Sequence, residues 1–464
     1  MEEMDLGTAK VSRLIRRFSV PCVISMVVAA LYNIVDQIFI GWSAAGAYGN
    51  AATNIVYPFT VLALGLALLV GDGAAAGFSI SLGMGDKERA TRFVGNGLSI
   101  LVMLALLLTL LGFACRPQIL GLFGGDPAEA ECYRYATEYF TIICTGLPFY
   151  MIGQGLNGTI RADGSPRYAM ACTLAGAVAN LVLDPLFIFV FGMGVKGAAI
   201  ATVIGQVLTF GMSVLYLTKS KAFNIQRSAL VPEAHTAVKI VTVGMASLIV
   251  QLSIVVIIAV NNNLLTRYGY ETYASTGVTF GAVIPLAVVG IVMKVFGIVV
   301  SIVIGISLGG QPIIGYNIGA GNVQRVKETI LVITRLVLIV GFIAFLIFEL
   351  LPDAVISLFG SHNTLEYMEY ARLCIRIFLG GIILTCFIKS AAIILQSMGN
   401  SVKSTILALL RDVVVFVPAS ILLASVSGSI VTMLWAAMIS DVISAVVGFM
   451  FTRSEIVKMH CRTE

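Results

Sequence analysis

Two acidic side chains inside long apolar stretches are the residues of this 464-residue chain best placed to do chemistry. They are Asp36 and Asp184, and each lies in a run of mostly apolar residues. A carboxylate in a helix at membrane depth costs about 2.5 to 3.5 kcal/mol, so an acid that is kept there indicates a function. The binding of a proton or a cation is the chemistry that such a pair suggests.

The two acids and two polar neighbours are expected at one depth. Counted at about 1.5 Å per helical residue from the nearest predicted outer loop, Asp36, Asp184 and Thr202 all fall roughly 8 to 12 Å inside the outer boundary. Asn180 precedes Asp184 by four residues and therefore shares its helical face. Asn33 stands three residues before Asp36 and is a possible accessory.

The side chains expected at this depth offer only oxygen ligands: two carboxylates, an amide oxygen and a hydroxyl. This donor set suits a hard cation such as Na⁺, for which Asp36, Asn180, Asp184 and Thr202 would be the metal ligands. The same pair of acids suits protons, because close carboxyl groups titrate together and burial favours the protonated form. The residues leave H⁺ and Na⁺ both open. A simpler alternative is that the acids only join helices by hydrogen bonds.

Composition places these residues in a membrane. The chain is 58% hydrophobic and 11% charged, with a mean hydropathy of +0.98. Twelve apolar runs reach the roughly 20 residues that cross a bilayer, which predicts an all-α polytopic protein with twelve transmembrane helices. The predicted spans are residues 15–41, 54–82, 93–114, 131–158, 167–191, 197–218, 237–266, 273–308, 327–350, 365–398, 403–425 and 429–451.

An internal repeat divides the chain into halves. The segment SLGMGD at 81–86 returns as NIGAGN at 317–322, which is 236 residues later. Six helices per half is an even number, so the halves form parallel repeats about an axis along the membrane normal, as in transporters with alternating access. We expect a first lobe at 1–220, a cytoplasmic linker at 221–236 and a second lobe at 237–464.

Charge bias predicts the orientation. Nineteen Lys and Arg fall on the loops of one side and four on the other, which places both termini in the cytoplasm. The net charge of +5 needs no nucleic-acid partner to explain it.

The motifs resemble the multidrug and toxic compound extrusion (MATE) family. They are Asn33-Ile34-Val35-Asp36, Asn180-x-x-x-Asp184-Pro185 and the loops GMGD at 83–86 and GAGN at 319–322. The segments GDGAAA at 71–76 and GQPIIGYN at 310–317 resemble its MepA-like bacterial branch.

This resemblance covers essentially the whole chain. It implies two six-helix lobes around a V-shaped cleft in a bacterial cytoplasmic membrane. It also implies a monomer that exports small organic cations, chiefly amphipathic drugs, against an inward H⁺ or Na⁺ gradient. Membrane lipid is then a partner, and no cofactor is expected besides the coupling ion. The residues that match the family's ion site are Asp36, Asn180, Asp184 and Thr202.

Other residues are weighed as accessories. Some members of the family carry a second acidic site in the seventh helix, where this chain has Gln251, so a second cation site is not expected there. Asp72 is a further deep acid, and Lys389 is a base that would repel cationic drugs or release a neighbouring acid. Pro21 removes a backbone hydrogen bond in the first helix, which we expect to bend there when Asp36 changes protonation.

Basic residues in the second half are explained most simply by ion pairs or by snorkelling to the membrane surface. They are Lys294, Lys389, Arg376 and Arg411, which stand beside the acids Asp412 and Asp441.

Three alternatives lie outside drug export. A flippase for a lipid-linked or amphiphilic metabolite would belong to the same superfamily. The motif GMGD at 83–86 is also that of intramembrane aspartyl proteases, with Asp36 as a partner for Asp86, but Asp86 is followed by Lys87-Glu88-Arg89 and is replaced by Asn322 in the repeat. The segment GISLG around Ser307 imitates a hydrolase elbow, but no histidine falls in a predicted span.

Overall fold

The computed structural model describes residues 6–43, 45–125, 127, 129–220, 227–274, 283–357 and 365–460. Within these ranges all regular structure is helical. The first half contains α1 (Val11–Trp42), α2 (Gly46–Gly83), α3 (Lys87–Ala114), α4 (Arg116–Leu122), α5 (Ala130–Ala162), α6 (Pro166–Pro185), the π-helix η1 (Leu186–Val190) and α7 (Val195–Lys219).

The second half follows a 3-10 turn, η2 (Arg227–Leu230). Its helices are α8 (Ala234–Ala274), α9 (Val283–Gly319), α10 (Val323–Leu350), α11 (Pro352–Ser357), α12 (Leu365–Leu379), α13 (Ile382–Ser397), α14 (Ser401–Leu409), the π-helix η3 (Leu410–Val415), α15 (Phe416–Ser427) and α16 (Ile430–His460).

The described helices account for the predicted membrane spans. Ten are long and apolar enough to cross a bilayer, or eleven if α12 and α13, which are bent by 43° between Leu379 and Ile382, make one span. The less apolar α5 is 33 residues long and packs against α2 and α7, inside the first bundle. With α5 included, the described helices correspond in position to the twelve predicted spans.

One predicted span is misplaced. Residues 273–308 were expected to cross, whereas α9 runs on to Gly319 and residues 275–282 lie outside the described ranges. The extension contains Gln311 and Asn317. Both are buried, and the Asn317 amide donates to the carbonyl oxygens of Ile313 at 2.8 Å and Leu6 at 3.1 Å. Tertiary partners therefore allow the helix to continue.

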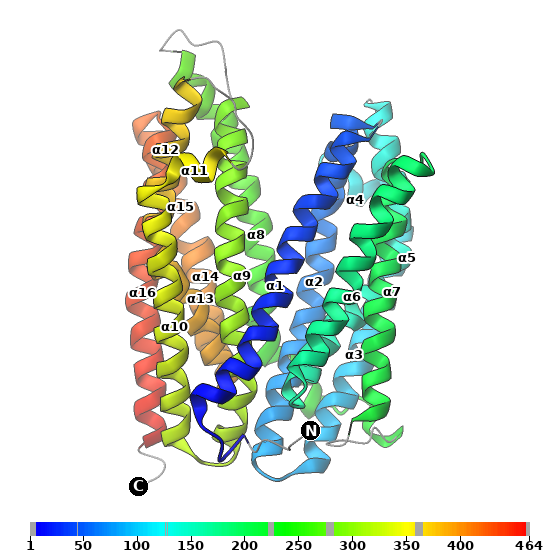
Figure 1. Ribbon diagram of the computed structural model, residues 1–464, viewed down its shortest axis with the longest axis vertical. Coiled ribbons are helices and arrows are strands. Elements are labelled where there is room, and N and C mark those ends of the chain that lie inside the picture. Colours follow the sequence, from blue (N-terminus) through cyan, green and yellow to red (C-terminus); the bar gives the residue numbers. More distant parts are fainter. Residues whose placement is uncertain are drawn as a thin grey trace.

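Two bundles diverge from a shared base (Figure 1). Helices α2 to α7 form one bundle and α8 to α16 the other. The start of α1 and the end of α16 both lie at the narrow end, where the bundles meet. Helix α1 runs obliquely between them, from the base of the second bundle to the open end of the first.

Helix α1 begins against the second bundle. The Arg325 guanidinium, at the start of α10, donates to the carbonyl oxygens of Leu6 at 3.1 Å and Ala9 at 2.6 Å. Further along, the Ser19 hydroxyl donates to the carbonyl oxygen of Ile306 at 3.0 Å. The part of α1 that precedes Pro21 is thus held by α9 and α10, while Asp36 lies beyond Pro21 in the same helix.

The duplicated loops pack against each other at this base. A Cβ atom on Gly83 would lie 1.9 Å from the carbonyl oxygen of Tyr316, and one on Gly319 would lie 2.0 Å from that of Ile80. These pairs are related by the same 236-residue offset as the repeat. Asp86 and Asn322 then cap α3 and α10 through the backbone N–H groups of Arg89 and Arg325. The sequence repeat therefore corresponds to equivalent packing at the ends of α2 and α9 and to equivalent caps at the starts of α3 and α10.

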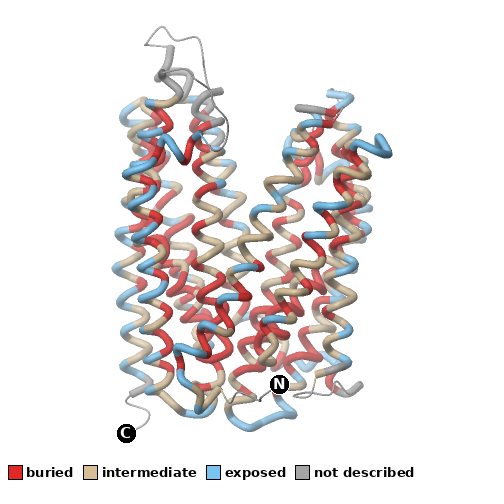
Figure 2. Tube along the Cα trace, in the orientation of Figure 1, coloured by how far each residue is buried: buried red, intermediate tan, exposed pale blue. Residues whose placement is uncertain are grey.

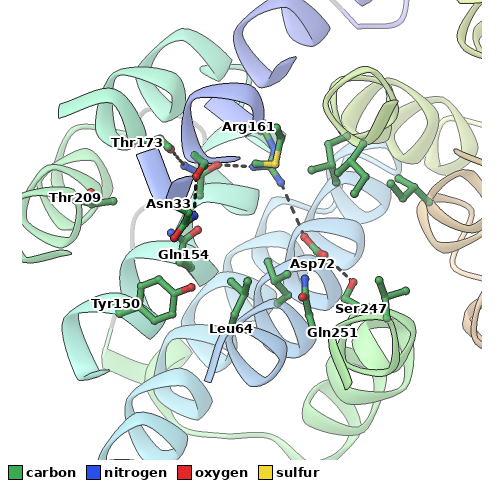
Figure 3. A pocket seen from close by; sticks show the side chains of 18 of the residues that line it. Asn33, Leu64, Asp72, Tyr150, Gln154, Arg161, Thr173, Thr209, Ser247 and Gln251 are labelled. Atoms are coloured by element: carbon green, nitrogen blue, oxygen red, sulfur yellow. Dashed lines mark hydrogen bonds and ion pairs between the residues drawn. The ribbon is translucent and has the colours of Figure 1, made fainter. Parts of the chain in front are cut away.

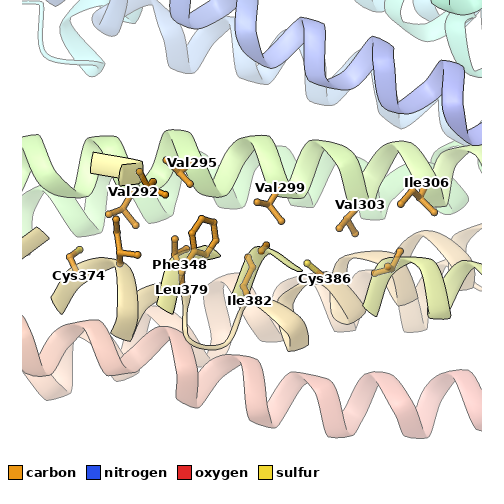
Figure 4. Close-up of a cluster of buried hydrophobic side chains, with 14 of the residues drawn as sticks. Val292, Val295, Val299, Val303, Ile306, Phe348, Cys374, Leu379, Ile382 and Cys386 are labelled. Atoms are coloured by element: carbon orange, nitrogen blue, oxygen red, sulfur yellow. The ribbon is translucent and has the colours of Figure 1, made fainter. Parts of the chain in front are cut away.

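Apolar stripes hold each bundle together. In the second bundle, Val292, Val295, Val299 and Val303 recur at helical spacing along α9 and pack into a buried cluster with α10, α12 and α13 (Figure 4). Outward-facing positions stay exposed (Figure 2), and the large apolar side chains among them include Leu110, Phe342 and Val446. An exposed apolar belt of this kind suits lipid contact.

The described end of the expected linker is tied to α3. The Asn96 amide donates to the carbonyl oxygen of Ala229 at 3.1 Å and accepts from the backbone N–H of Glu233 at 2.6 Å. The Ser99 hydroxyl donates to the carbonyl oxygen of Leu230 at 2.6 Å. Residues 221–226 of the expected linker lie outside the described ranges.

Candidate functional site

A cavity of about 310 Å³ lies between the two bundles. Helices α1, α2, α5, α6 and α7 line it on one side, and α8, α9, α13, α14 and η3 line it on the other. Polar side chains from both sides point toward one another within it (Figure 3). The cavity contacts Asn33, Asn180 and Thr202 of the predicted site and also Gln251 and Lys389.

The structure brings the four predicted ion-site residues together. The side-chain amide of Asn180 donates to Asp184 Oδ1 at 3.1 Å and to Thr202 Oγ1 at 3.3 Å. Asn180 is 3% exposed and Asp184 is 1% exposed. Asn180 and Asp184 lie one turn apart on α6, and Thr202 faces them from α7, so the helical spacing aligns the three groups.

Asp36 completes this group from α1. Its carboxyl group lies close enough to that of Asp184 for the two charges to interact strongly. Asp36 Oδ1 is buried and has no protein partner among the described residues. Two carboxyl groups in such contact repel each other unless a proton or a cation lies between them. Among the described residues, no basic side chain is hydrogen-bonded to either acid.

The ligand chemistry favours a proton or a hard cation. Among the described residues, no group of three or more His, Cys, Asp or Glu side chains could hold a metal ion. A cation between Asp36 and Asp184 would therefore take its further oxygens from the Asn180 amide and the Thr202 hydroxyl, which are ligands typical of alkali ions rather than transition metals.

The accessory residues divide by position. The Asn33 amide donates back to the carbonyl oxygen of Ala29 at 2.7 Å and lies at the cavity, while Gln251 lines the cavity from α8. Pro21 lies inside the continuous helix α1, and the Ser25 hydroxyl donates to its carbonyl oxygen at 2.9 Å.

A second polar level joins the two bundles. The Ser247 hydroxyl of α8 donates to Asp72 Oδ2 of α2 at 2.7 Å, and the Gln396 amide of α13 donates to the Ser247 oxygen at 3.0 Å. Arg161 Nη2 of α5 lies 3.9 Å from Asp72 Oδ1 (Figure 3). Arg161 is one of the nineteen basic residues that the charge bias placed on loops of one side. This placement was wrong, because Arg161 lies in the last turn of α5 and is 5% exposed.

The second bundle holds its own charged cluster. Lys389 Nζ contacts Asp412 at 2.7 Å, and the Arg411 guanidinium contacts Asp412 at 2.8 Å and Asp441 at 2.9 Å. The Thr385 hydroxyl also donates to Asp441, at 2.6 Å. Both acids are satisfied by buried partners, as the ion-pair explanation expects.

The exposed bases differ from this cluster. Lys294 is exposed on α9, and Arg376 is exposed and contacts Glu349 of α10.

The two protease-like and hydrolase-like motifs have structural roles. Asp86 is exposed and caps α3. Ser307 is 1% exposed in the middle of α9, where its hydroxyl donates to the carbonyl oxygen of Val303 and to Ser390 Oγ. A serine inside a continuous helix cannot form the strand-to-helix elbow of a hydrolase.

Comparisons with known proteins agree with this architecture. A sequence model of the MatE family matches residues 21–186 and 275–422. The multidrug export protein MepA of Staphylococcus saprophyticus is 26% identical over 433 residues, which cover 92% of this chain and 90% of that protein. The protein of the same name from Staphylococcus aureus strain MRSA252 is 24% identical over 431 residues, with the same coverage of 92% and 90%.

The fold is that of a solved transporter. The structure described as the outward-facing conformation of a multidrug resistance MATE family transporter of the MOP superfamily matches with a TM-score of 0.89. It is 23% identical and the match covers 99% of both chains. The family match spans both halves of the sequence and includes Asp36 and Asp184. This chain therefore belongs to the MatE family, whose members are membrane transporters and not enzymes.

Proposed function

We propose that this protein is a secondary active antiporter that exports amphipathic organic cations in exchange for H⁺ or Na⁺. The observation that carries the proposal is the contact between Asp36 and Asp184 beside a cavity shared by the two bundles. An acid pair without a basic partner binds a cation or a proton strongly. The cavity lies next to this pair, so the charge of the pair would change the affinity of the cavity for a substrate.

Alternating access then couples the two events. With the pair empty, its charge favours a cationic substrate in the cavity. When the coupling ion enters from outside, it neutralises the pair and the attraction for the substrate is lost. Each charge that the ion carries across the membrane field contributes about 2.3 kcal/mol per 100 mV. The ion is cargo in this cycle, and no cofactor takes part.

The moving parts are proposed to be the two lobes, 1–220 and 237–464, joined by 221–236. Helix α1 is the element best placed to connect the ion site with lobe movement, because its start is bonded to α9 and α10 while Asp36 contacts α6. Pro21 lies between these two regions, so we assign it the bend.

The oligomeric state, location and orientation of the protein are part of the same proposal. The protein would act as a monomer in a bacterial cytoplasmic membrane, with both termini in the cytoplasm. The narrow end of the molecule, where α1 starts and α16 ends, then faces inward, and the bundles diverge toward the outside (Figure 1).

A flippase is the second candidate, because basic side chains line the cavity. Arg161, Lys389 and Arg411 do so. Lys389 and Arg411 are engaged by the acids Asp412 and Asp441, and Arg161 lies 3.9 Å from Asp72. Their charge is largely compensated within the protein, which favours export of small molecules over capture of a lipid phosphate by this cluster.

Accumulation of a fluorescent organic cation in inverted vesicles tests the proposal. The vesicles are loaded either with acid in sodium-free buffer or with Na⁺ at equal pH, so that each gradient acts alone. At least one gradient must drive accumulation, and failure of both would reject antiport. Thr202→Val separates the ions: it removes a Na⁺ ligand and weakens sodium-driven transport, whereas a proton held by the two acids does not need this hydroxyl.

A further inference from the structure

Asp72 of α2 lies between two partners that belong to different bundles. Its Oδ2 atom accepts a hydrogen bond from the Ser247 hydroxyl of α8 at 2.7 Å, and its Oδ1 atom lies 3.9 Å from Nη2 of Arg161 on α5 (Figure 3). The contact with Ser247 crosses between the bundles. The contact with Arg161 stays within the first bundle and is too long for a hydrogen bond. In this form of the protein the carboxylate is therefore bonded to the second bundle.

The backbone of α2 packs closely against both neighbours at this point. A Cβ atom on Gly71 would lie 2.5 Å from the carbonyl oxygen of Gly155 in α5, and one on Gly73 would lie 2.1 Å from that of Ile240 in α8. The two glycines flank Asp72, so α2 approaches each helix through a residue without a side chain. The contact with α5 lies within one bundle, whereas the contact with α8 must break if the bundles part here.

The second bundle holds Ser247 in place. The side-chain amide of Gln396 on α13 donates to Ser247 Oγ at 3.0 Å and to the carbonyl oxygen of Val243 at 3.1 Å. A row of hydrogen bonds therefore runs from Asp72 through Ser247 to Gln396, and all three residues line the cavity.

This row lies on the narrow side of the candidate ion site. Asp72 is in the half of α2 that ends at the narrow end, whereas Asp36 is close to the end of α1 at the wide end (Figure 1). Alternating access requires the cavity to become open at the narrow end in one form of the protein. In that form the row between the two bundles must be broken, and Asp72 loses its hydrogen bond to Ser247.

Arg161 is able to replace the lost partner. Among the described residues, its side chain makes one hydrogen bond, from Nη1 to Asn157 Oδ1, which leaves the Nη2 group free for Asp72. The Asn157 amide donates to the carbonyl oxygen of Ala169 and to Thr173 Oγ1, each at 3.2 Å. These bonds hold the guanidinium in the first bundle, so Arg161 stays beside Asp72 when the second bundle moves away.

The energetics favour such a replacement. Asp72 is 6% exposed and Arg161 is 5% exposed, so neither charge is open to bulk solvent. A buried carboxylate that loses a hydrogen bond is costly unless another donor takes its place. A movement of about 1 Å would convert the present separation of 3.9 Å into a charge-assisted hydrogen bond. A small rotation of the Asp72 carboxylate is enough for this change.

We propose that Asp72 exchanges partners during the transport cycle and that Arg161 is the positioning residue that receives it when the narrow end opens. The inference rests on the proposed alternating access and names a group that stabilises each of its two forms. Ser247 stabilises the wide-open form, which is the form of this structure. Arg161 stabilises the narrow-open form, in which the bundles have parted at the narrow end.

The distance between two spin labels measures the ratio of the two forms. Labels on cysteines at Tyr48 of α2 and Leu350 of α10 mark the wide ends of the two bundles, and these positions are 54% and 71% exposed. The eight native cysteines are replaced, and the background is used once it transports as the wild type does. Double electron–electron resonance is recorded on the full-length protein in nanodiscs, at low and neutral pH and with and without Na⁺. The separation is long in the wide-open form and shorter in the narrow-open form.

Two single variants should shift this ratio in opposite directions. Ser247→Ala removes the hydrogen bond of the wide-open form and should raise the ratio of narrow-open to wide-open protein about threefold or more. Arg161→Gln removes the charged partner of the narrow-open form and should lower the same ratio about tenfold. Arg161→Lys keeps the charge but loses the planar fork, so its effect should be smaller than that of Arg161→Gln. General damage to the fold would not produce shifts of opposite sign.

Asp72→Asn links the two effects. In the Asp72→Asn background, Arg161→Gln should change the ratio by less than about twofold, because no carboxylate remains for Arg161 to receive. This double variant also strands no buried charge, so it remains informative if Arg161→Gln alone folds poorly. Arg167→Gln on α6 and Ser425→Ala on α15 replace exposed residues and are the matched controls, which should leave the ratio unchanged. Shifts of the same sign, unchanged ratios, or a full effect of Arg161→Gln in the Asp72→Asn background would overturn the exchange.

The outcome is separable from the export proposal. Ion-driven accumulation of a fluorescent organic cation in inverted vesicles reports antiport without any label. Opposite shifts of the ratio without ion-driven transport would reject antiport and support the exchange. Transport without opposite shifts would reject the exchange alone, and a single distance in every variant and condition would reject both the exchange and alternating access.

Discussion

Gly83 of α2 and Gly319 of α9 occupy equivalent positions in the two halves, and each lies against the backbone of the other helix. The carbonyl oxygens of Tyr316 and Ile80 stand where the missing Cβ atoms would be, at 1.9 and 2.0 Å. The backbones come this close because neither residue has a side chain. This contact joins the end of α2 to the end of α9 and thereby links the two bundles.

Gly319→Ala should therefore open this end. The new methyl group cannot fit against a backbone carbonyl, and overpacking of this kind costs about 1 to 3 kcal/mol. We expect a lower melting temperature in detergent and faster labelling of a cysteine placed at Ser247, from the side of the termini. Gly211→Ala is the control, because a Cβ there meets nothing within 4 Å. Equal stability of the two variants would contradict the close packing.

Arg411→Met should strongly destabilise the second bundle. Arg411 contacts both Asp412 and Asp441, and its loss strands buried carboxylates at a cost of about 3 to 5 kcal/mol. Arg376→Met removes an exposed base and should cost at most about 1 kcal/mol. Thermal unfolding of the two variants side by side measures the difference, and comparable melting temperatures would show that the buried cluster contributes little.

Asp163 should make stability depend on pH. It lies in the turn between α5 and α6 and accepts from the hydroxyls of Tyr216 at 2.6 Å and Ser220 at 2.8 Å. Burial raises the pKa of Asp163 above its ordinary value of 3.8, and the two hydroxyl donors oppose this only in part. The folded state thus binds the proton more tightly than the unfolded state.

The sign follows from this difference. The stabilisation is complete below the unfolded pKa of 3.8 and is lost as pH rises through the higher pKa of the folded state. The melting temperature of the wild type relative to Asp163→Asn should therefore fall as pH rises above 3.8. A difference that grows with pH instead would reverse the assignment.

Pro21→Ala should slow transport and spare substrate binding. The substitution lets residue 21 donate the backbone hydrogen bond that proline lacks, so α1 resists bending between its contact with α9 and the acid at Asp36. Transport in vesicles and dye binding in nanodiscs measure the two steps separately. Undiminished transport by the variant would remove Pro21 from the mechanism.

Much of the fold follows from the sequence, because apolar runs and the repeat are local patterns. The repeat offset of 236 residues also relates α3, Lys87–Ala114, to α10, Val323–Leu350, end to end. Local patterns fail where tertiary contacts decide. The predicted span 365–398 is bent between α12 and α13, where a Cβ on Gly381 would approach Asp441 Oδ2 to 2.6 Å.

The candidate site shows the same difference between residues that local patterns predict and residues that only tertiary contacts reveal. Apolar context and helical spacing predicted Asp36, Asn180, Asp184 and Thr202 as one group, and the structure places these side chains near one another. Their role in ion binding stays a prediction. Arg161 was missed because a base near a predicted loop looks like an ordinary surface charge. Only the packing of α5 against α2 and α6 shows that it is buried beside Asp72 and Asn157. The mutual pairing of Lys389, Arg411, Asp412 and Asp441 likewise needed the fold.

The central claim is that the carboxyl pair of Asp36 and Asp184 couples ion entry to export. The most direct measurement is gradient-driven accumulation of a fluorescent organic cation in inverted vesicles by Asp36→Asn and Asp184→Asn. Asp353→Asn is the matched control, because Asp353 forms an exposed ion pair with Arg372 far along the chain from this site.

We predict that each coupling variant loses roughly tenfold or more of the driven transport, as loss of a charged ligand would cause. The control should transport at the wild-type rate. Normal accumulation by Asp36→Asn and Asp184→Asn, at wild-type protein levels and under the gradient that drives the wild type, would contradict the account.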